Sequence, residues 1–138
     1  MTHRSEVPAK PSTVKAWIIT IVSACVVAIV GTFTYRLGAA YNIPYGLFLS
    51  LLMVGMSSFM GAVRGSVWHV FVHGLVSISI VWAMALSSTS TSTVVALGGS
   101  SLITYWSKNC SLYWLYGIIV IHLIIMFIPQ QWVNAFKD

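Results

Sequence analysis

Four long apolar segments, uncharged in their interiors, constrain the fold of this chain more than any other feature. They cover approximately residues 14–35, 44–62, 66–86 and 111–128. A helix needs about 20 mostly apolar residues to cross the hydrocarbon of a bilayer, and each segment approaches that length. Lipid offers the backbone no hydrogen-bond partners, so such segments must be helical. The pattern predicts an all-α, polytopic membrane protein with four transmembrane helices.

The charge inventory is small and one-sided. Charged residues make up 7% of the 138 residues, with seven basic and two acidic side chains, and the two acids, Glu6 and Asp138, lie near the chain ends. No carboxylate is therefore left within the spans for acid–base catalysis, for a metal cage or for proton antiport. The sequence also contains no nucleophile paired with a base and no cofactor motif. We expect a protein that is not an enzyme and needs no cofactor.

The basic residues predict the orientation in the membrane. Lys and Arg are enriched in cytoplasmic loops, and an N-terminus inside would give five inner cations, Arg4, Lys10, Lys15, Arg64 and Lys137, against two outer ones, Arg36 and Lys108. We therefore expect a multi-pass protein of the cell membrane with both termini in the cytoplasm. Aromatic residues gather near the predicted span edges as in interfacial belts, which places Tyr35 and Trp114 at the outer edge.

The remaining segments are polar or of mixed character. Residues 1–13 and 129–138 are predicted to be cytoplasmic tails, the first of them disordered. The basic residues of the first tail favour contact with anionic lipid headgroups over nucleic acid. Residues 87–110 are predicted to form a Ser/Thr-rich outer loop. Within it, residues 94–106 either lie at the interface or form a re-entrant hairpin, and the interfacial alternative is favoured because re-entrant backbone must be buried.

Small residues recur at helical spacing along the second span. Such spacing lets helix backbones approach closely, either within one four-helix bundle or between two copies of the chain. Packing within the bundle is the simpler interpretation, and a homodimer is the alternative. The candidate packing residues are Gly46, Ser50, Ser57, Gly61 and Gly65.

Three histidines form the best candidate for a chemical site. His69 and His73 are four residues apart on the third span and so share a helix face. His122 of the fourth span should lie at a similar depth, roughly 10 Å from the cytoplasmic side, because a helix rises about 1.5 Å per residue. Three imidazoles could bind zinc, copper or haem iron. The alternative is a set of interior histidines hydrogen-bonded to serines or backbone carbonyls.

Arg36 is the most notable cation, because it follows the first span at its outer end. Its side chain is expected to extend to the lipid headgroups. Alternatively, it could attract anions into an outer vestibule.

Two resemblances involve the stretch VGTFTYRLGAAYNIPYGLFLSLLMVGMSSFMGAVRG. Its Gly and Arg after the first span and its Pro-x-Gly before the second superficially resemble the small four-helix fluoride channels. The pore asparagine and the Phe-bearing break of those channels have no counterpart here. The same stretch, together with WLYG at Trp114–Gly117 and with Pro129, is similar to an actinobacterial family of small four-helix membrane proteins of unknown function. That resemblance implies a topology without an activity.

Three functions from different classes remain open. The default expectation is an accessory or scaffold protein whose partners are the lipid bilayer and other membrane proteins. The second is a small anion channel or transporter, monomeric or dimeric, that uses Arg36. The third is metal or haem binding by His69, His73 and His122.

Overall fold

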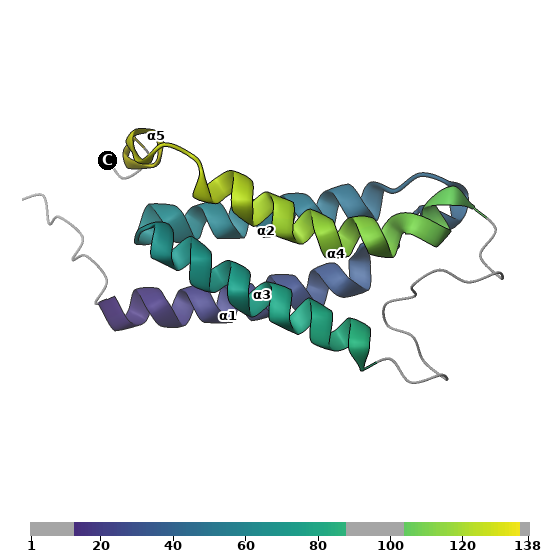
Figure 1. Cartoon of the computed structure of the whole chain (residues 1–138), viewed down its shortest axis with the longest axis horizontal. Coiled ribbons are helices and arrows are strands. Elements are labelled where there is room, and N and C mark those ends of the chain that lie inside the picture. The colour runs from purple at the N-terminus through teal and green to yellow at the C-terminus, as the bar shows by residue number, and fades with distance from the viewer. Residues whose placement is uncertain (1–12, 88–103, 136–138) are drawn as a thin grey trace, which may run out of the picture.

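The structure is a computed structural model that describes residues 13–87 and 104–135. Four long helices dominate it: α1 (Thr13–Thr34), α2 (Tyr45–Arg64), α3 (Val67–Leu86) and α4 (Tyr105–Met126), accompanied by the short helices η1 (Ala39–Tyr41) and α5 (Gln130–Asn134) (Figure 1). The described residues contain no strand. All four long helices are long and apolar enough to cross a membrane. The predictions of an all-α fold and of four helices of spanning length are confirmed.

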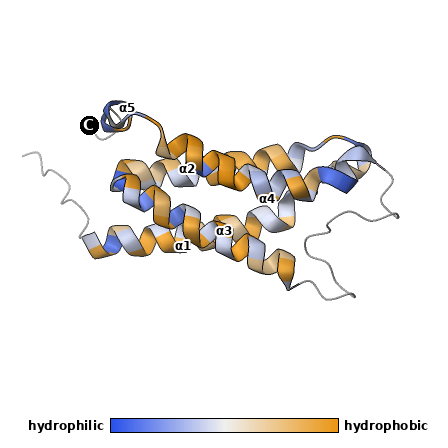
Figure 2. Ribbon diagram, viewed as in Figure 1, coloured by the Kyte–Doolittle hydropathy of each residue, from blue (hydrophilic) through white to orange (hydrophobic). Residues whose placement is uncertain are grey.

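The long helices form one bundle. α1 packs against α2 and α3, α4 packs against the same two helices, and α2 and α3 also contact each other. Four crossings bring the start of α1 and the short helix α5 to the same end of the bundle (Figure 1). We call this end the Arg64 end, after the last residue of α2, and the opposite end the Lys108 end. Figure 2 shows hydrophilic residues gathered at α5 and in the first turns of α4, with hydrophobic ribbon along the middle of the helices.

The fourth helix begins earlier than the sequence predicted. The predicted outer loop extended to residue 110, but α4 starts at Tyr105, and the side chain of Thr104 caps it by accepting a hydrogen bond from the backbone N–H of Ser107. The prediction of a loop over residues 105–110 is wrong because polar residues in a first helical turn can satisfy its free N–H groups. The question of an interfacial or re-entrant segment concerns mainly residues 94–103, which lie outside the described residues.

The predicted second tail is partly folded. α5 turns back after Pro129, and its Val133 is buried against Ala62, Val70 and Ile125 at the Arg64 end. Burial of one valine stabilises a short helix that would be marginal by itself. Residues 1–12 and 136–138 of the two predicted tails lie outside the described residues.

A tight turn joins α1 to α2 at the Lys108 end. Gly38 adopts a positive φ of 81°, and a Cβ there would collide with the backbone oxygen of Ile43 and with the ring of Tyr45. The N–H of Gly46 donates to the carbonyl of Leu37 at 3.0 Å. The turn therefore needs glycine at residue 38, and it fixes α1 and α2 as antiparallel neighbours.

The core near the Lys108 end is an aromatic cluster, which we define as Tyr35, Cys110, Ser111 and Trp114. Tyr35 and Trp114 are both fully buried, and their rings stack with centroids 5.9 Å apart. The hydroxyl of Tyr35 lies 3.1 Å from Oγ of Ser111, and Sγ of Cys110 donates to the carbonyl of Tyr35. The expectation that Tyr35 and Trp114 form part of an interfacial belt is wrong. Partners for their polar atoms inside the bundle remove the need for water.

Candidate functional site

The most distinctive group inside the bundle is a pair of histidines. His73 of α3 is fully buried and His122 of α4 is 6% exposed, and Nδ1 of His73 lies 3.0 Å from Nε2 of His122. Gly74 makes room for this approach, because a Cβ at that position would lie 2.9 Å from Cδ2 of His122. A direct hydrogen bond between two imidazoles therefore joins α3 to α4.

A serine extends the pair to a third helix. Oγ of Ser57 on α2 lies 3.0 Å from Nε2 of His73. At the other end, Nδ1 of His122 lies 2.7 Å from the carbonyl oxygen of Ile118, one turn earlier in α4. We call Ser57, His73 and His122 the histidine chain. It connects α2, α3 and α4 through consecutive hydrogen bonds.

Hydrogen-bond chemistry assigns the direction of every bond in this chain. A carbonyl oxygen only accepts, so Nδ1 of His122 carries a hydrogen. A neutral imidazole has one N–H, so Nε2 of His122 accepts from Nδ1–H of His73. Nε2 of His73 must in turn accept from the hydroxyl of Ser57. With both rings neutral, each carries its hydrogen on Nδ1, and every ring nitrogen has a partner.

Ser77 provides a further polar group beside the pair. Its hydroxyl donates to the carbonyl of His73 at 2.7 Å, and its Oγ lies 3.4 Å from Nε2 of His122. A serine that bonds to its own helix in this way keeps its oxygen lone pairs free to accept. The Ser77 oxygen is therefore placed to face a hydrogen on Nε2 of His122.

His69 does not join the other two histidines. Its ring stacks on Trp17 of α1 with centroids 4.0 Å apart, and its Nδ1 accepts from the backbone N–H of Ser66 in the capping box of α3. Among residues 13–87 and 104–135, no group of three His, Cys, Asp or Glu side chains could hold a metal ion. The expected grouping of His69 with His73 and His122 is not formed. A metal held by the remaining two rings, at about 2.0 Å from each nitrogen, would have to replace their hydrogen bond.

The small residues of α2 pack within one chain. Gly46 faces the backbone oxygen of Thr34 on α1, and Oγ of Ser50 lies 2.8 Å from Oγ1 of the same threonine. A Cβ at Gly65 would collide with the ring of His69, whereas one at Gly61 would meet no atom within 4 Å. Gly46 and Ser50 therefore serve α1–α2 packing in the bundle, and the homodimer stays a prediction.

Arg36 lies in the turn after α1, at the Lys108 end, and is half-buried. Its carbonyl accepts from the N–H of Ala39, which begins η1. The Lys108 end thus receives a positive charge next to the aromatic cluster. The anion vestibule expected there stays a prediction.

In the sequence, Ser57 is a candidate packing residue, and its place as the partner of His73 becomes visible only in the structure. The depths of the two residues in the bundle point to a Ser57–His73 contact. Ser57 precedes the end of α2 by about two helical turns, and His73 follows the start of α3 by nearly two. Two residues at equal depth on consecutive antiparallel helices are natural neighbours. The direction in which each side chain points around its helix was the missing information.

No family model, no curated protein and no solved structure matches the chain. The two resemblances drawn from the sequence stay predictions. A function is therefore inferred below from the geometry of the chain alone.

Proposed function

We propose that this chain is a non-enzymatic accessory protein of a cell membrane that takes up one proton on the histidine chain and thereby changes how α2, α3 and α4 are held together. The supporting observation is the unbroken hydrogen-bond sequence from Ser57 through His73 to His122. Ionisable side chains inside a membrane are costly and usually functional. Histidine is also the side chain whose charge changes most readily near neutral pH.

The histidine chain can accept a proton without losing a hydrogen bond between Ser57, His73 and His122. A proton delivered from the Ser57 side binds Nε2 of His73, while the hydrogen on Nδ1 of His73 passes to Nε2 of His122. His122 then carries two N–H groups and one positive charge, and its Nε2–H donates to Nδ1 of His73. His73 stays neutral and donates from Nε2 to the oxygen of Ser57. The Ser57 hydroxyl is then free to donate to its own helix backbone.

A second proton is strongly disfavoured. Both rings would be positive, and two N–H groups would face each other across 3.0 Å. The pair therefore has a capacity of one proton, shared through a common hydrogen bond. This capacity distinguishes it from two independent histidines.

The surroundings of His122 disfavour a positive charge in the present arrangement of the helices, so protonation favours a different arrangement. Other titratable side chains toward the Arg64 end are Lys15 on α1, Arg64 on α2 and His69 on α3. The only carboxylates of the sequence outside the chain terminus belong to Glu6 and Asp138. A charge on His122 is thus opposed by cations and balanced mainly by the carbonyl oxygen of Ile118 and the oxygen of Ser77. An arrangement of α2 and α4 that solvates this charge better would be favoured on protonation.

The orientation belongs to the same proposal. The five-to-two distribution of basic residues favours the Arg64 end on the cytoplasmic side, with both termini there. The histidine chain would then exchange protons with the cytoplasm, since it lies nearer to that end. An accessory protein of this kind would report cytoplasmic acidification to its neighbours in the membrane.

Distance measurements between spin labels on α2 and α4 test the proposal. Met56 and Ile124 are 63% and 60% exposed, so labels at these positions disturb little of the interior. In nanodiscs, in a background with Cys25 and Cys110 replaced by serine, we expect the label separation to change by about 1–2 Å or more between about pH 8 and about pH 4, because burial disfavours the charged form of a histidine. The change should disappear in the His73→Gln and His122→Asn variants.

His69→Gln is the matched control. It removes a titratable ring from the same helix but keeps a Ser-x-x-Gln capping box at the start of α3. The control should respond to pH as the unsubstituted chain does. A response that follows His69 instead of His73 and His122, or an unsubstituted chain with no response, would reject the proposed function.

A further inference from the structure

We propose a lipid-binding site in the groove between α2 and α4, which holds the acyl chain of an anionic lipid whose head contacts Lys108. The groove contains none of the residues of the histidine chain and opens outward from the bundle. It consists of two neighbouring hollows that share Leu51, one of about 570 Å³ toward the Lys108 end and one of about 380 Å³ toward the Arg64 end.

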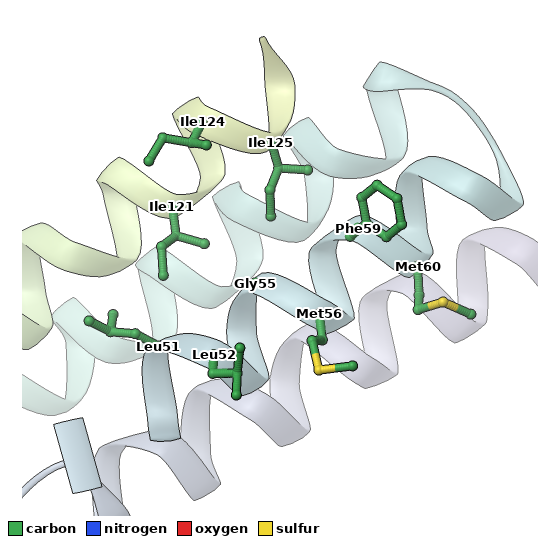
Figure 3. A pocket seen from close by; sticks show the side chains of 9 residues that line it. All are labelled: Leu51, Leu52, Gly55, Met56, Phe59, Met60, Ile121, Ile124 and Ile125. Carbon is green, nitrogen blue, oxygen red and sulfur yellow. The ribbon is translucent and has the colours of Figure 1, made fainter. Parts of the chain in front are cut away.

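Glycines create the depth of the groove. Gly55 on α2 and Gly117 on α4 both line it. A Cβ at Gly117 would lie 3.0 Å from Leu51, and one at Gly55 would lie 3.5 Å from Ile121, so larger side chains would begin to fill this space. In Figure 3 the side chains of α2 and α4 stand on either side of the Gly55 position.

The chemistry of the walls changes along the groove. The hollow toward the Arg64 end is entirely apolar, with Met56, Met60 and Ile124 among its lining residues. The hollow toward the Lys108 end adds polar tips from Asn109, Tyr113 and Tyr116 to an apolar floor. A polar rim above an apolar trough is complementary to an amphiphile that inserts from one end.

The positive charge at the rim selects the head of that amphiphile. Lys108 is exposed and lies beside the groove, outside its lining and one helical turn before the lining residue Leu112. The described residues include no Asp or Glu, so no described carboxylate competes for this ammonium. Charge complementarity therefore favours a phosphate-bearing or other anionic head.

The direct contact between α2 and α4 favours an acyl chain over a partner helix as the occupant of the groove. α2 and α4 contact each other directly, so the groove is only as deep as the side chains on either side. A single alkyl chain fits such a trough, whereas a helix of about 10 Å diameter would rest on its edges. The occupant we infer is therefore one lipid and not a transmembrane segment.

Native mass spectrometry of delipidated protein tests the site. Titration with phosphatidylglycerol and with phosphatidylcholine of the same acyl chains should show about a fivefold preference for the anionic lipid. Lys108→Gln should abolish this preference and leave phosphatidylcholine binding unchanged. Arg36→Gln is the matched control, since it removes a cation at the same end of the bundle but in the turn after α1 and not on α4, and it should retain the preference.

A second variant tests the trough itself. Leu112→Trp adds bulk at a position that is 45% exposed and should weaken binding of both lipids without unfolding the protein, which circular dichroism checks. The proposal is overturned if Lys108→Gln and Arg36→Gln behave alike, if Leu112→Trp binds both lipids normally, or if the groove crosslinks to a second copy in preference to lipid.

Discussion

The aromatic cluster at the Lys108 end and the histidine chain nearer the Arg64 end both hold helices together inside the bundle, but they use different chemistry. Each is buried, and each bonds helices to one another through polar atoms. The cluster depends on the shape of large rings, and its hydrogen bonds involve hydroxyl, thiol and indole groups that stay neutral near pH 7. The histidine chain depends on which nitrogens carry hydrogens. The aromatic cluster therefore has one hydrogen-bonding arrangement near pH 7, whereas a neutral and a charged arrangement can be written for the histidine chain.

Glycines show the same division. A Cβ at Gly31 would lie 2.5 Å from Cη2 of Trp114, and a Cβ at Gly74 would lie 2.9 Å from Cδ2 of His122. Both glycines thus admit a ring from α4. The first admits an indole, which does not take up a proton, and the second admits an imidazole, which can.

Removal of the central ring of the aromatic cluster should have the largest effect. Trp114→Ala leaves a cavity at a fully buried position and unpairs Oγ1 of Thr32 from the indole N–H. We expect a loss of about 3–5 kcal/mol in the free energy of unfolding, equal at all pH values. Equilibrium unfolding in mixed micelles measures it. Trp68→Ala, at a position 69% exposed, is the control and should cost far less.

Removal of the last ring of the histidine chain should have an intermediate effect. His122→Leu leaves Nδ1–H of His73 without its acceptor, and an unpaired buried donor costs about 1–3 kcal/mol. The same unfolding measurement at about pH 8 detects this loss, and the residual stability should vary less with pH than in the unsubstituted chain. Full stability in the leucine variant would mean that the imidazole bond contributes nothing.

Two serine truncations should have the smallest effects and compare the histidine chain with a hydrogen bond between α1 and α2. Ser50→Ala removes a bond to Thr34, and Ser57→Ala removes a bond to His73. Each should cost about 0.6 kcal/mol, the average for hydrogen bonds between membrane helices. Only Ser57→Ala should alter the pH dependence of the α2–α4 distance. If both variants alter it equally, the pH response does not belong to the histidine chain.

The sequence predicted the helices well because length and hydropathy decide membrane spans. Bilayer thickness fixes how many residues a span needs, so 44–62 and 66–86 closely match α2 and α3. The start of α4 was missed because a Thr104 cap and polar first-turn residues look like a loop in sequence. Hydropathy reflects the free energy of moving a segment into lipid. It carries no information on whether a side chain such as Thr104 caps the start of a helix.

The site was predicted only in part. Spacing placed His69 and His73 on one face of α3. In the structure, however, His69 stacks on Trp17 of α1, whereas His73 contacts His122 of α4. Neighbours along a single helix face contact different helices wherever helices cross at an angle. The sequence could not supply the rotation of α4, and therefore could not choose between a metal triad and a hydrogen-bonded pair.

Nitrogen NMR of ¹⁵N-histidine-labelled protein in nanodiscs measures whether His73 and His122 take up one proton as a pair. Imidazole nitrogen shifts report which ring atom carries hydrogen. We expect the Nδ1–H form for both rings at about pH 8, and on acidification a coupled change of both rings with uptake of one proton per protein molecule, retained in His69→Gln. Independent behaviour of the two rings, or an Nε2–H form of His122 at about pH 8, would contradict this expectation.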